Sequence, residues 1–196
     1  MKQHASQIAV AARESRTSLG FWLYLMTDCL LFASLFATYV VLRDSTAGGP
    51  AGREIFDLPI VLIETILLLI SSFTTGLAMI ALRLKSLKYV LIFLAITYVL
   101  GVAFLTIEVN EFTTLVADGH SWQQSAFLSA FFTLVGTHGL HITVGLLWLL
   151  VLVVTMIRRG ITVKIRRQLL LFAMFWHFLD VIWIFIFTVV YLTGVV

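Results

Sequence analysis

Five apolar runs dominate this 196-residue sequence, and each is at least as long as the roughly 18 residues that a membrane-spanning helix needs. The chain is 61% hydrophobic and only 12% charged, whereas soluble domains are about 45–50% apolar and about 25% charged. The pattern therefore predicts an all-α integral membrane protein with five transmembrane helices. We expect a five-helix domain over residues 20–196, preceded by a polar cytoplasmic tail over residues 1–19. The predicted spans cover residues 20–42, 58–82, 89–107, 126–157 and 168–193.

The basic residues are distributed unevenly between the predicted loops, and this asymmetry predicts the topology. Of the 13 Lys and Arg residues, all but Arg43 and Arg53 lie in the tail or in the loops after the second and fourth runs. The polar loop over residues 112–125 contains none. Because cytoplasmic loops are rich in Lys and Arg, the N-terminus is predicted to be cytoplasmic and the C-terminus periplasmic. The net charge of +3 is thus a topology signal, and we expect no nucleic-acid partner.

The first run is predicted to be a retained span, although a signal peptide would also begin with a basic segment. The run is longer than the apolar core of a signal peptide, and Asp28 interrupts it. The single cysteine, Cys29, excludes an internal disulfide and cannot form a thiolate metal site alone.

Two histidines lie three residues apart near the middle of the fourth run. His138 and His141 share one face of the predicted helix, and the glycines beside them allow a neighbouring helix to approach closely. His177 and Asp180 have the same spacing in the last run. Because such groups are costly at membrane depth, they usually face protein and usually have a function.

The depths of the polar side chains, at about 1.5 Å of rise per residue, define two layers. Only the middle layer lies where polar groups are most costly. The middle layer holds Asp28, His138, His177 and Asp180, and the outer half holds Glu64, Glu108 and Glu111.

Three interpretations of these residues are open. Three histidines with carboxylates would suit iron, copper or zinc, but the chain has no Glu-x-x-His pair and no Cys-x-x-Cys pair. The imidazoles could instead form hydrogen bonds to Asp28, Glu64 or Asp180 across helices and fix the packing. A third possibility is proton or lipid handling, in which Asp28 is a candidate proton acceptor and a candidate target of hydrophobic carbodiimides. The sequence contains no nucleophile elbow, phosphate loop or Rossmann glycine pattern, so we predict no catalytic, cofactor-binding or metal-binding residue.

Several motifs, in the same order, resemble subunit III of the haem–copper terminal oxidases. The resemblance covers roughly residues 19–196 and is specific because the motifs occur together. They are residues 137–141 (THGLH), residues 176–183 (WHFLDVIW), the first-span segment 20–28 with its buried carboxylate, Glu108 with Glu111, and residues 129–132 (SAFF).

Within this family, the five-span form and residues 46–59 resemble the cytochrome o ubiquinol oxidases. The resemblance implies a four-subunit complex that reduces oxygen with quinol electrons and pumps protons across the bacterial inner membrane. It implies that subunit I carries the haems and copper and is the main contact, and that subunits II and IV and bound phospholipid are further partners. This chain would carry no redox centre, and would support the assembly and stability of subunit I.

The resemblance also implies a role for the polar layer. Asp28 matches the carboxylate that reacts with carbodiimide in related oxidases, where it is a glutamate. We expect one interhelical hydrogen-bond network beside a lipid cleft, formed by Asp28, His138, His141, His177 and Asp180. An alternative from another class of membrane protein is an autonomous proton-coupled transporter, although the chain lacks the repeats that many transporters show. A self-contained membrane metalloenzyme is a second alternative.

Overall fold

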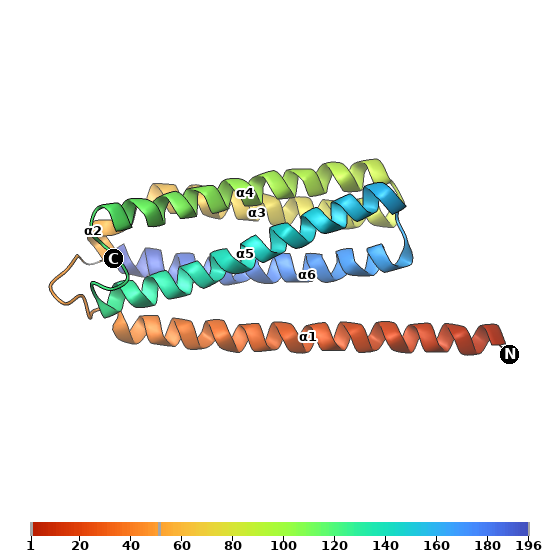
Figure 1. Cartoon of the computed structure of the whole chain (residues 1–196), viewed down its shortest axis with the longest axis horizontal. Coiled ribbons are helices and arrows are strands. Elements are labelled where there is room, and N and C mark those ends of the chain that lie inside the picture. The colour runs from red at the N-terminus through yellow and green to blue at the C-terminus, as the bar shows by residue number, and fades with distance from the viewer. Residues whose placement is uncertain (1, 51, 196) are drawn as a thin grey trace.

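The computed structural model describes residues 2–50 and 52–195, with side chains from Arg16 onward, and this part of the chain contains helices and no strands. Figure 1 shows five long helices running along one common axis. The helices are α1 (Lys2–Leu42), α2 (Gly52–Ile55), α3 (Leu58–Arg83), α4 (Leu87–Ala117), α5 (Ala126–Arg159), α6 (Val163–Ile186), the π-helix η1 (Phe187–Leu192) and α7 (Thr193–Val195).

Five helical segments are long and apolar enough to cross a membrane. Four of them belong to α1, α3, α4 and α5, and the fifth is continuous through α6, η1 and α7 from Val163 to Val195. The predicted all-α fold with five transmembrane helices is therefore confirmed.

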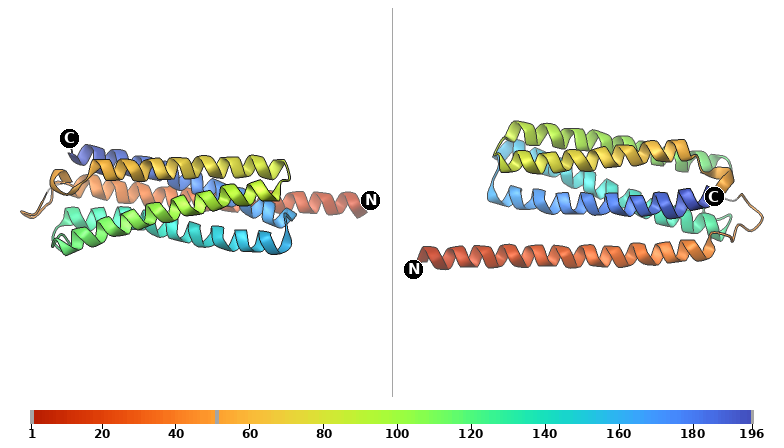
Figure 2. Two further views of the ribbon diagram at one scale, coloured as in Figure 1. Left: turned by 90° about the horizontal axis from the view of Figure 1, so that it is seen from above. Right: turned by 180° about the vertical axis from the view of Figure 1, so that it is seen from behind.

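Helices α3, α4, α5 and α6 form a four-helix bundle in which each helix packs against the next and α6 packs back against α3. Helix α1 lies outside this bundle, against α5 and α6, and it is the least buried of the five (Figures 1 and 2). Figure 1 also shows α5 crossing away from α1 toward the end where Arg159 lies. The first helix is therefore held by fewer contacts than the others.

Large aromatic side chains fill the centre of the bundle, and two glycines make room for one of them. Trp176 is 1% exposed. A Cβ built on Gly101 of α4 would lie 3.0 Å from the Trp176 ring, and one built on Gly145 of α5 would lie at the same distance. Both helices can therefore approach the indole closely, as small residues permit in membrane proteins.

Two predicted boundaries need correction. The third span was predicted to end at residue 107 and to be followed by a polar loop over residues 112–125, but α4 continues to Ala117. The polar residues Glu108 and Glu111 face protein, so their polarity does not end the helix. The last long helix begins at Val163, ahead of the predicted span start at residue 168, because Thr162 caps the helix and its hydroxyl oxygen accepts a hydrogen bond from Ile165 N at 3.3 Å. At the other end of the chain, α1 begins at Lys2, so the polar tail is helical and continuous with the first span.

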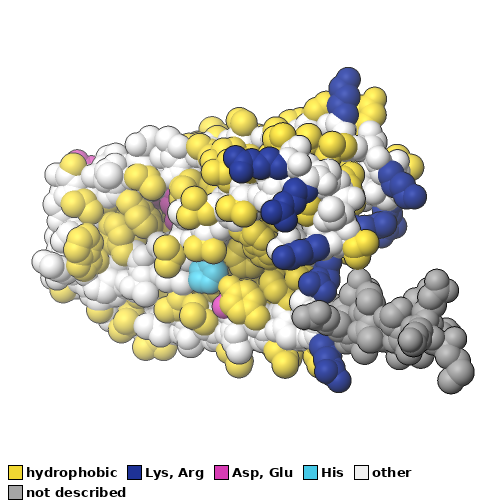
Figure 3. All heavy atoms as spheres, turned by 45° about the vertical axis from the view of Figure 1, so that its right-hand side comes forward, with side chains coloured by type: hydrophobic (Ala, Val, Ile, Leu, Met, Phe, Trp, Pro, Cys, Tyr) yellow, Lys and Arg dark blue, Asp and Glu magenta, His cyan; other side chains and the backbone are white. Residues whose placement is uncertain are grey.

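Lys and Arg side chains gather at one end of the face drawn in Figure 3, and hydrophobic side chains are spread over the rest of that face. This end holds the turn between α3 and α4 and the turn between α5 and α6. The opposite end holds the longer connection from α1 to α3 and the turn between α4 and α5. The two ends thus differ in charge as the sequence predicts for the two sides of a membrane.

Candidate functional site

Asp28 and His141 join the outlying helix α1 to α5. Asp28 is 7% exposed, and its Oδ2 lies 3.7 Å from Nε2 of His141. The other ring nitrogen of His141, Nδ1, lies 2.7 Å from the carbonyl oxygen of Thr137. A carbonyl oxygen only accepts hydrogen bonds, so Nδ1 carries a hydrogen and Nε2 faces the carboxyl group of Asp28. This pair is a polar contact between α1 and the bundle at membrane depth.

His138 does not belong to this contact, although it was predicted to share one hydrogen-bond network with Asp28 and His141. Its side chain is fully buried, and neither ring nitrogen has a hydrogen-bond partner among the described residues. The imidazole lies among the rings of Phe32, Phe104 and Trp183, with centroid distances of 6.4, 6.0 and 5.2 Å. The helical rotation between His138 and His141 therefore turns the first toward the aromatic interior and the second toward α1.

His177 and Asp180 form a separate polar group on α6. Nδ1 of His177 lies 2.6 Å from Oγ of Ser72 on α3, and Asp180 lies beside the same serine. No hydrogen bond or ion pair within the described ranges joins this group to Asp28 or His141. The expected single network of five residues is therefore wrong, because α6 turns His177 toward α3 and away from α1.

Three carboxyl groups, of which Glu64 and Glu108 are buried and Glu111 is half-buried, lie near one another at the opposite end from the basic residues. Glu64 comes from α3, and Glu108 and Glu111 come from α4. The Tyr191 hydroxyl of η1 donates a hydrogen bond to Oε2 of Glu111 at 3.3 Å. The carboxyl oxygens of Glu64 and Glu108 have no hydrogen-bond partner among the described residues. A buried carboxylate without a partner is costly, so Glu64 and Glu108 are unusual groups to find within the apolar spans.

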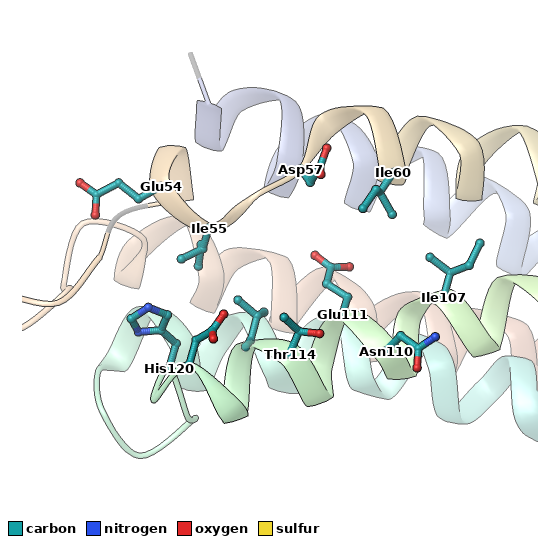
Figure 4. A pocket seen from close by; sticks show the side chains of 11 residues that line it. Glu54, Ile55, Asp57, Ile60, Ile107, Asn110, Glu111, Thr114 and His120 are labelled. Atoms are coloured by element: carbon teal, nitrogen blue, oxygen red, sulfur yellow. The ribbon is translucent and has the colours of Figure 1, made fainter.

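A cavity of about 500 Å³ opens beside Glu111 at this end of the bundle. Figure 4 shows Glu111 pointing toward Asp57, with Thr114 and His120 further along α4 and its following turn. The cavity was not expected from the sequence, because it depends on how the loop before α3 folds over α4. It gives the carboxyl cluster a neighbouring cavity that is lined by both apolar and polar side chains.

Ser72 and Tyr191, the partners of His177 and Glu111, were not predicted from the sequence. The signal for Ser72 was present as the segment Ser71-Ser72-Phe73-Thr74-Thr75, which is unusually polar for the second apolar run. The described residues contain no group of three or more His, Cys, Asp or Glu side chains that could hold a metal ion.

These features define a helical integral membrane protein whose acidic groups and imidazoles lie mostly between its helices. The model of the cytochrome c oxidase subunit III family matches residues 7–195, and the chain belongs to this family.

Curated relatives resemble the chain over most of its length. Cytochrome bo(3) ubiquinol oxidase subunit 3 of Pseudomonas aeruginosa is 54% identical over 178 residues, which are 91% of this chain and 85% of the relative. Cytochrome c oxidase subunit 3 of Bacillus sp. PS3 is 47% identical over 178 residues, which are 91% of this chain and 86% of the relative. Quinol oxidase subunit 3 of Bacillus subtilis is 44% identical over 196 residues, which are 98% of this chain and 96% of the relative.

Proposed function

We propose that this chain is subunit III of a bacterial haem–copper oxidase that takes electrons from a quinol, reduces oxygen and pumps protons across the inner membrane. The observation that carries the proposal is the 54% identity to a relative named as a ubiquinol oxidase subunit, over 91% of the chain. The relative from Bacillus sp. PS3 is named as a cytochrome c oxidase subunit. The electron donor is therefore the part of the proposal that the experiment must test most directly.

In this proposal the chain has no catalytic centre of its own and stabilises the subunits that do. Subunit I would carry the haems and copper and would be the main contact, with subunits II and IV as further partners. The basic end of the bundle would face the cytoplasm and the end with the carboxyl cluster would face the periplasm, because Lys and Arg are concentrated at the first end. The contact between Asp28 and His141 would hold α1 against α5 during turnover.

Bound phospholipid is a further part of the proposal, and a cavity of about 480 Å³ supports it. The cavity is lined by Ser18 of α1 and by Arg166, Arg167, Leu170 and Met174 of α6. Nε of Arg167 is buried and has no hydrogen-bond partner within the described part of the chain. Guanidinium groups bind phosphate well, and apolar side chains beneath them suit acyl chains. An anionic phospholipid thus fits between α1 and α6.

Purification of the tagged chain from its native membrane in mild detergent tests the proposal. We expect larger partner subunits to co-purify, haem absorption in the optical spectrum, and oxygen uptake driven by quinol. Oxygen uptake driven by cytochrome c and not by quinol would refute the proposed donor. A colourless preparation that contains this chain alone would refute the complex and favour an autonomous transporter.

A further inference from the structure

His177 has an unusual position for an imidazole in a membrane protein. It lies near the middle of the span Val163–Val195, roughly 21 Å along the helix axis from Val163. Its side chain is exposed, whereas the other described Asp, Glu and His side chains inside the five spans are buried or half-buried. The isolated chain therefore presents a polar ring on its outer surface at membrane depth.

A groove of about 430 Å³ lies beside His177, between α3 and α6. Ser72 reaches His177 from α3 at 2.6 Å, so the two helices are joined at this point. Asp180, one turn further along α6, lines the same groove, and its buried Oδ1 has no hydrogen-bond partner among the described residues. Figure 2 shows α3 and α6 side by side in the view from behind.

The groove has apolar walls and a gap at Gly76, which we call the notch. Phe73 of α3 is 67% exposed and Ile80 is 56% exposed. Between them lies Gly76, and no atom lies within 4 Å of the position that a Cβ on this glycine would occupy. A groove between two helices that is lined by small and apolar residues matches the shape of a third helix.

Lipid is a poor occupant of this groove. Ser72 pairs with only one ring nitrogen of His177, and the buried oxygen of Asp180 remains without a partner. Acyl chains offer no hydrogen bonds, and polar groups at membrane depth normally face protein. The imidazole of His177 is the exposed polar group at this groove, and a polar side chain of a protein partner can hydrogen-bond to it, whereas an acyl chain cannot.

We propose that the groove between α3 and α6 is the docking site for a membrane-spanning helix of another oxidase subunit. The docked helix carries a side chain that can hydrogen-bond, such as a hydroxyl or an amide, at the depth of His177. This inference rests on the proposed place of the chain in an oxidase complex, and it adds the face through which the chain binds. Lipid and a second copy of this chain are the competing occupants.

Filling the notch tests the proposal without disturbing the fold. Because no atom lies within 4 Å of a Cβ at Gly76, Gly76→Leu adds a side chain that begins in open space. Gly20→Leu on α1 is the matched control, since no atom lies within 4 Å of a Cβ there either. We expect Gly76→Leu to lower the amount of partner subunit and haem recovered per tagged chain by at least about tenfold. We expect Gly20→Leu to recover as much as the wild type, and both variants to accumulate normally in the membrane.

A photoreactive benzoylphenylalanine in place of Phe73 identifies the occupant and does not depend on filling the notch. The same residue in place of Val99 on α4, which is 64% exposed, is the control. Irradiation of the intact complex is expected to link Phe73, and not Val99, to another oxidase subunit.

Each way the inference could fail has a distinct signature. Recovery of partners with Gly76→Leu at the wild-type level overturns it, provided that the wild-type chain itself co-purifies with them. Adducts at Phe73 that contain only lipid or a second copy of this chain, or no subunit adduct at all, also overturn it. A wild-type chain that co-purifies with no partner refutes the proposed function instead.

Discussion

The carboxyl group of Glu108 fills the space that a side chain on Gly139 would need. A Cβ built on Gly139 would lie 2.6 Å from Oε1 and 2.9 Å from Oε2 of Glu108. Gly139 stands between the two histidines of the Thr137–His141 segment, so the glycine allows α5 to pass directly over a buried acid of α4. The glycine of this segment therefore allows α4 to pack closely on α5, and the same segment positions the two histidines.

Gly139→Ala is expected to destabilise the protein by about 1–3 kcal/mol, because the new methyl group must displace the carboxyl of Glu108 or push the helices apart. The measurement is thermal inactivation of the purified complex. Gly136→Ala is the control, since its nearest contact would be Phe112 at 3.5 Å, an ordinary van der Waals distance. The double variant Glu108→Ala with Gly139→Ala should lose less stability than the sum of the single variants. Equal stability of the Gly139→Ala and Gly136→Ala variants would contradict this account.

Asp28→Ala is expected to shorten the catalytic lifetime of the complex by about threefold while the initial rate of oxygen uptake stays near the wild-type rate. Polar contacts between helices in a membrane are worth only ~0.6 kcal/mol on average, so loss of the contact with His141 loosens α1 without unfolding the bundle. Cys29→Ala alters the neighbouring, exposed position and serves as the control. The measurement is oxygen uptake followed through prolonged turnover. Immediate and total loss of oxygen reduction in a fully assembled complex would contradict this role for Asp28.

The number of spans, and which polar residues lie within them, could be predicted from the sequence. Long apolar runs and the distribution of Lys and Arg are local properties, so they can be counted without knowing how helices pack. Glu108 and Glu111 show the limit of this approach. Their charge suggested the end of a span, but α4 continues to Ala117, with Glu108 buried and Glu111 half-buried.

The pairing of the polar residues could not be predicted, because it depends on the rotation of each helix about its axis. His138 and His141 belong to one short motif, and yet one lies in an aromatic enclosure while the other reaches Asp28. His177 has Ser72 as its partner, 105 positions away in the chain. The spacing of two residues within one helix shows whether they share a face of that helix. It does not show which neighbouring helix packs against that face.

Ser71→Ala is expected to cost about 1–3 kcal/mol, because it leaves a buried indole N–H without its acceptor. Nε1 of Trp176 donates to Oγ of Ser71 at 3.0 Å and joins α6 to α3 inside the bundle. The control is Ser34→Ala, which removes an exposed hydroxyl that bonds only to the carbonyl oxygen of Leu31 in its own helix. Thermal inactivation of the two variants should separate them clearly. If Ser71→Ala were as stable as Ser34→Ala, the bond between α3 and α6 would contribute nothing measurable.

Replacement of both Arg166 and Arg167 by Gln is expected to reduce the anionic phospholipid that remains bound after purification. The two guanidinium groups line the cavity between α1 and α6, and the amide of Gln keeps polarity there but removes the charge that attracts phosphate. Replacement of Arg158 and Arg159 by Gln removes the same charge from the same end of the bundle, outside this cavity, and is the control. Native mass spectrometry of the two complexes measures the bound lipid directly. We expect at least about a threefold loss of bound phospholipid for the first pair and little change for the second, since a general surface attraction would weaken equally in both. Equal losses in the two variants would show that the basic end attracts lipid as a whole and that the cavity does not select it.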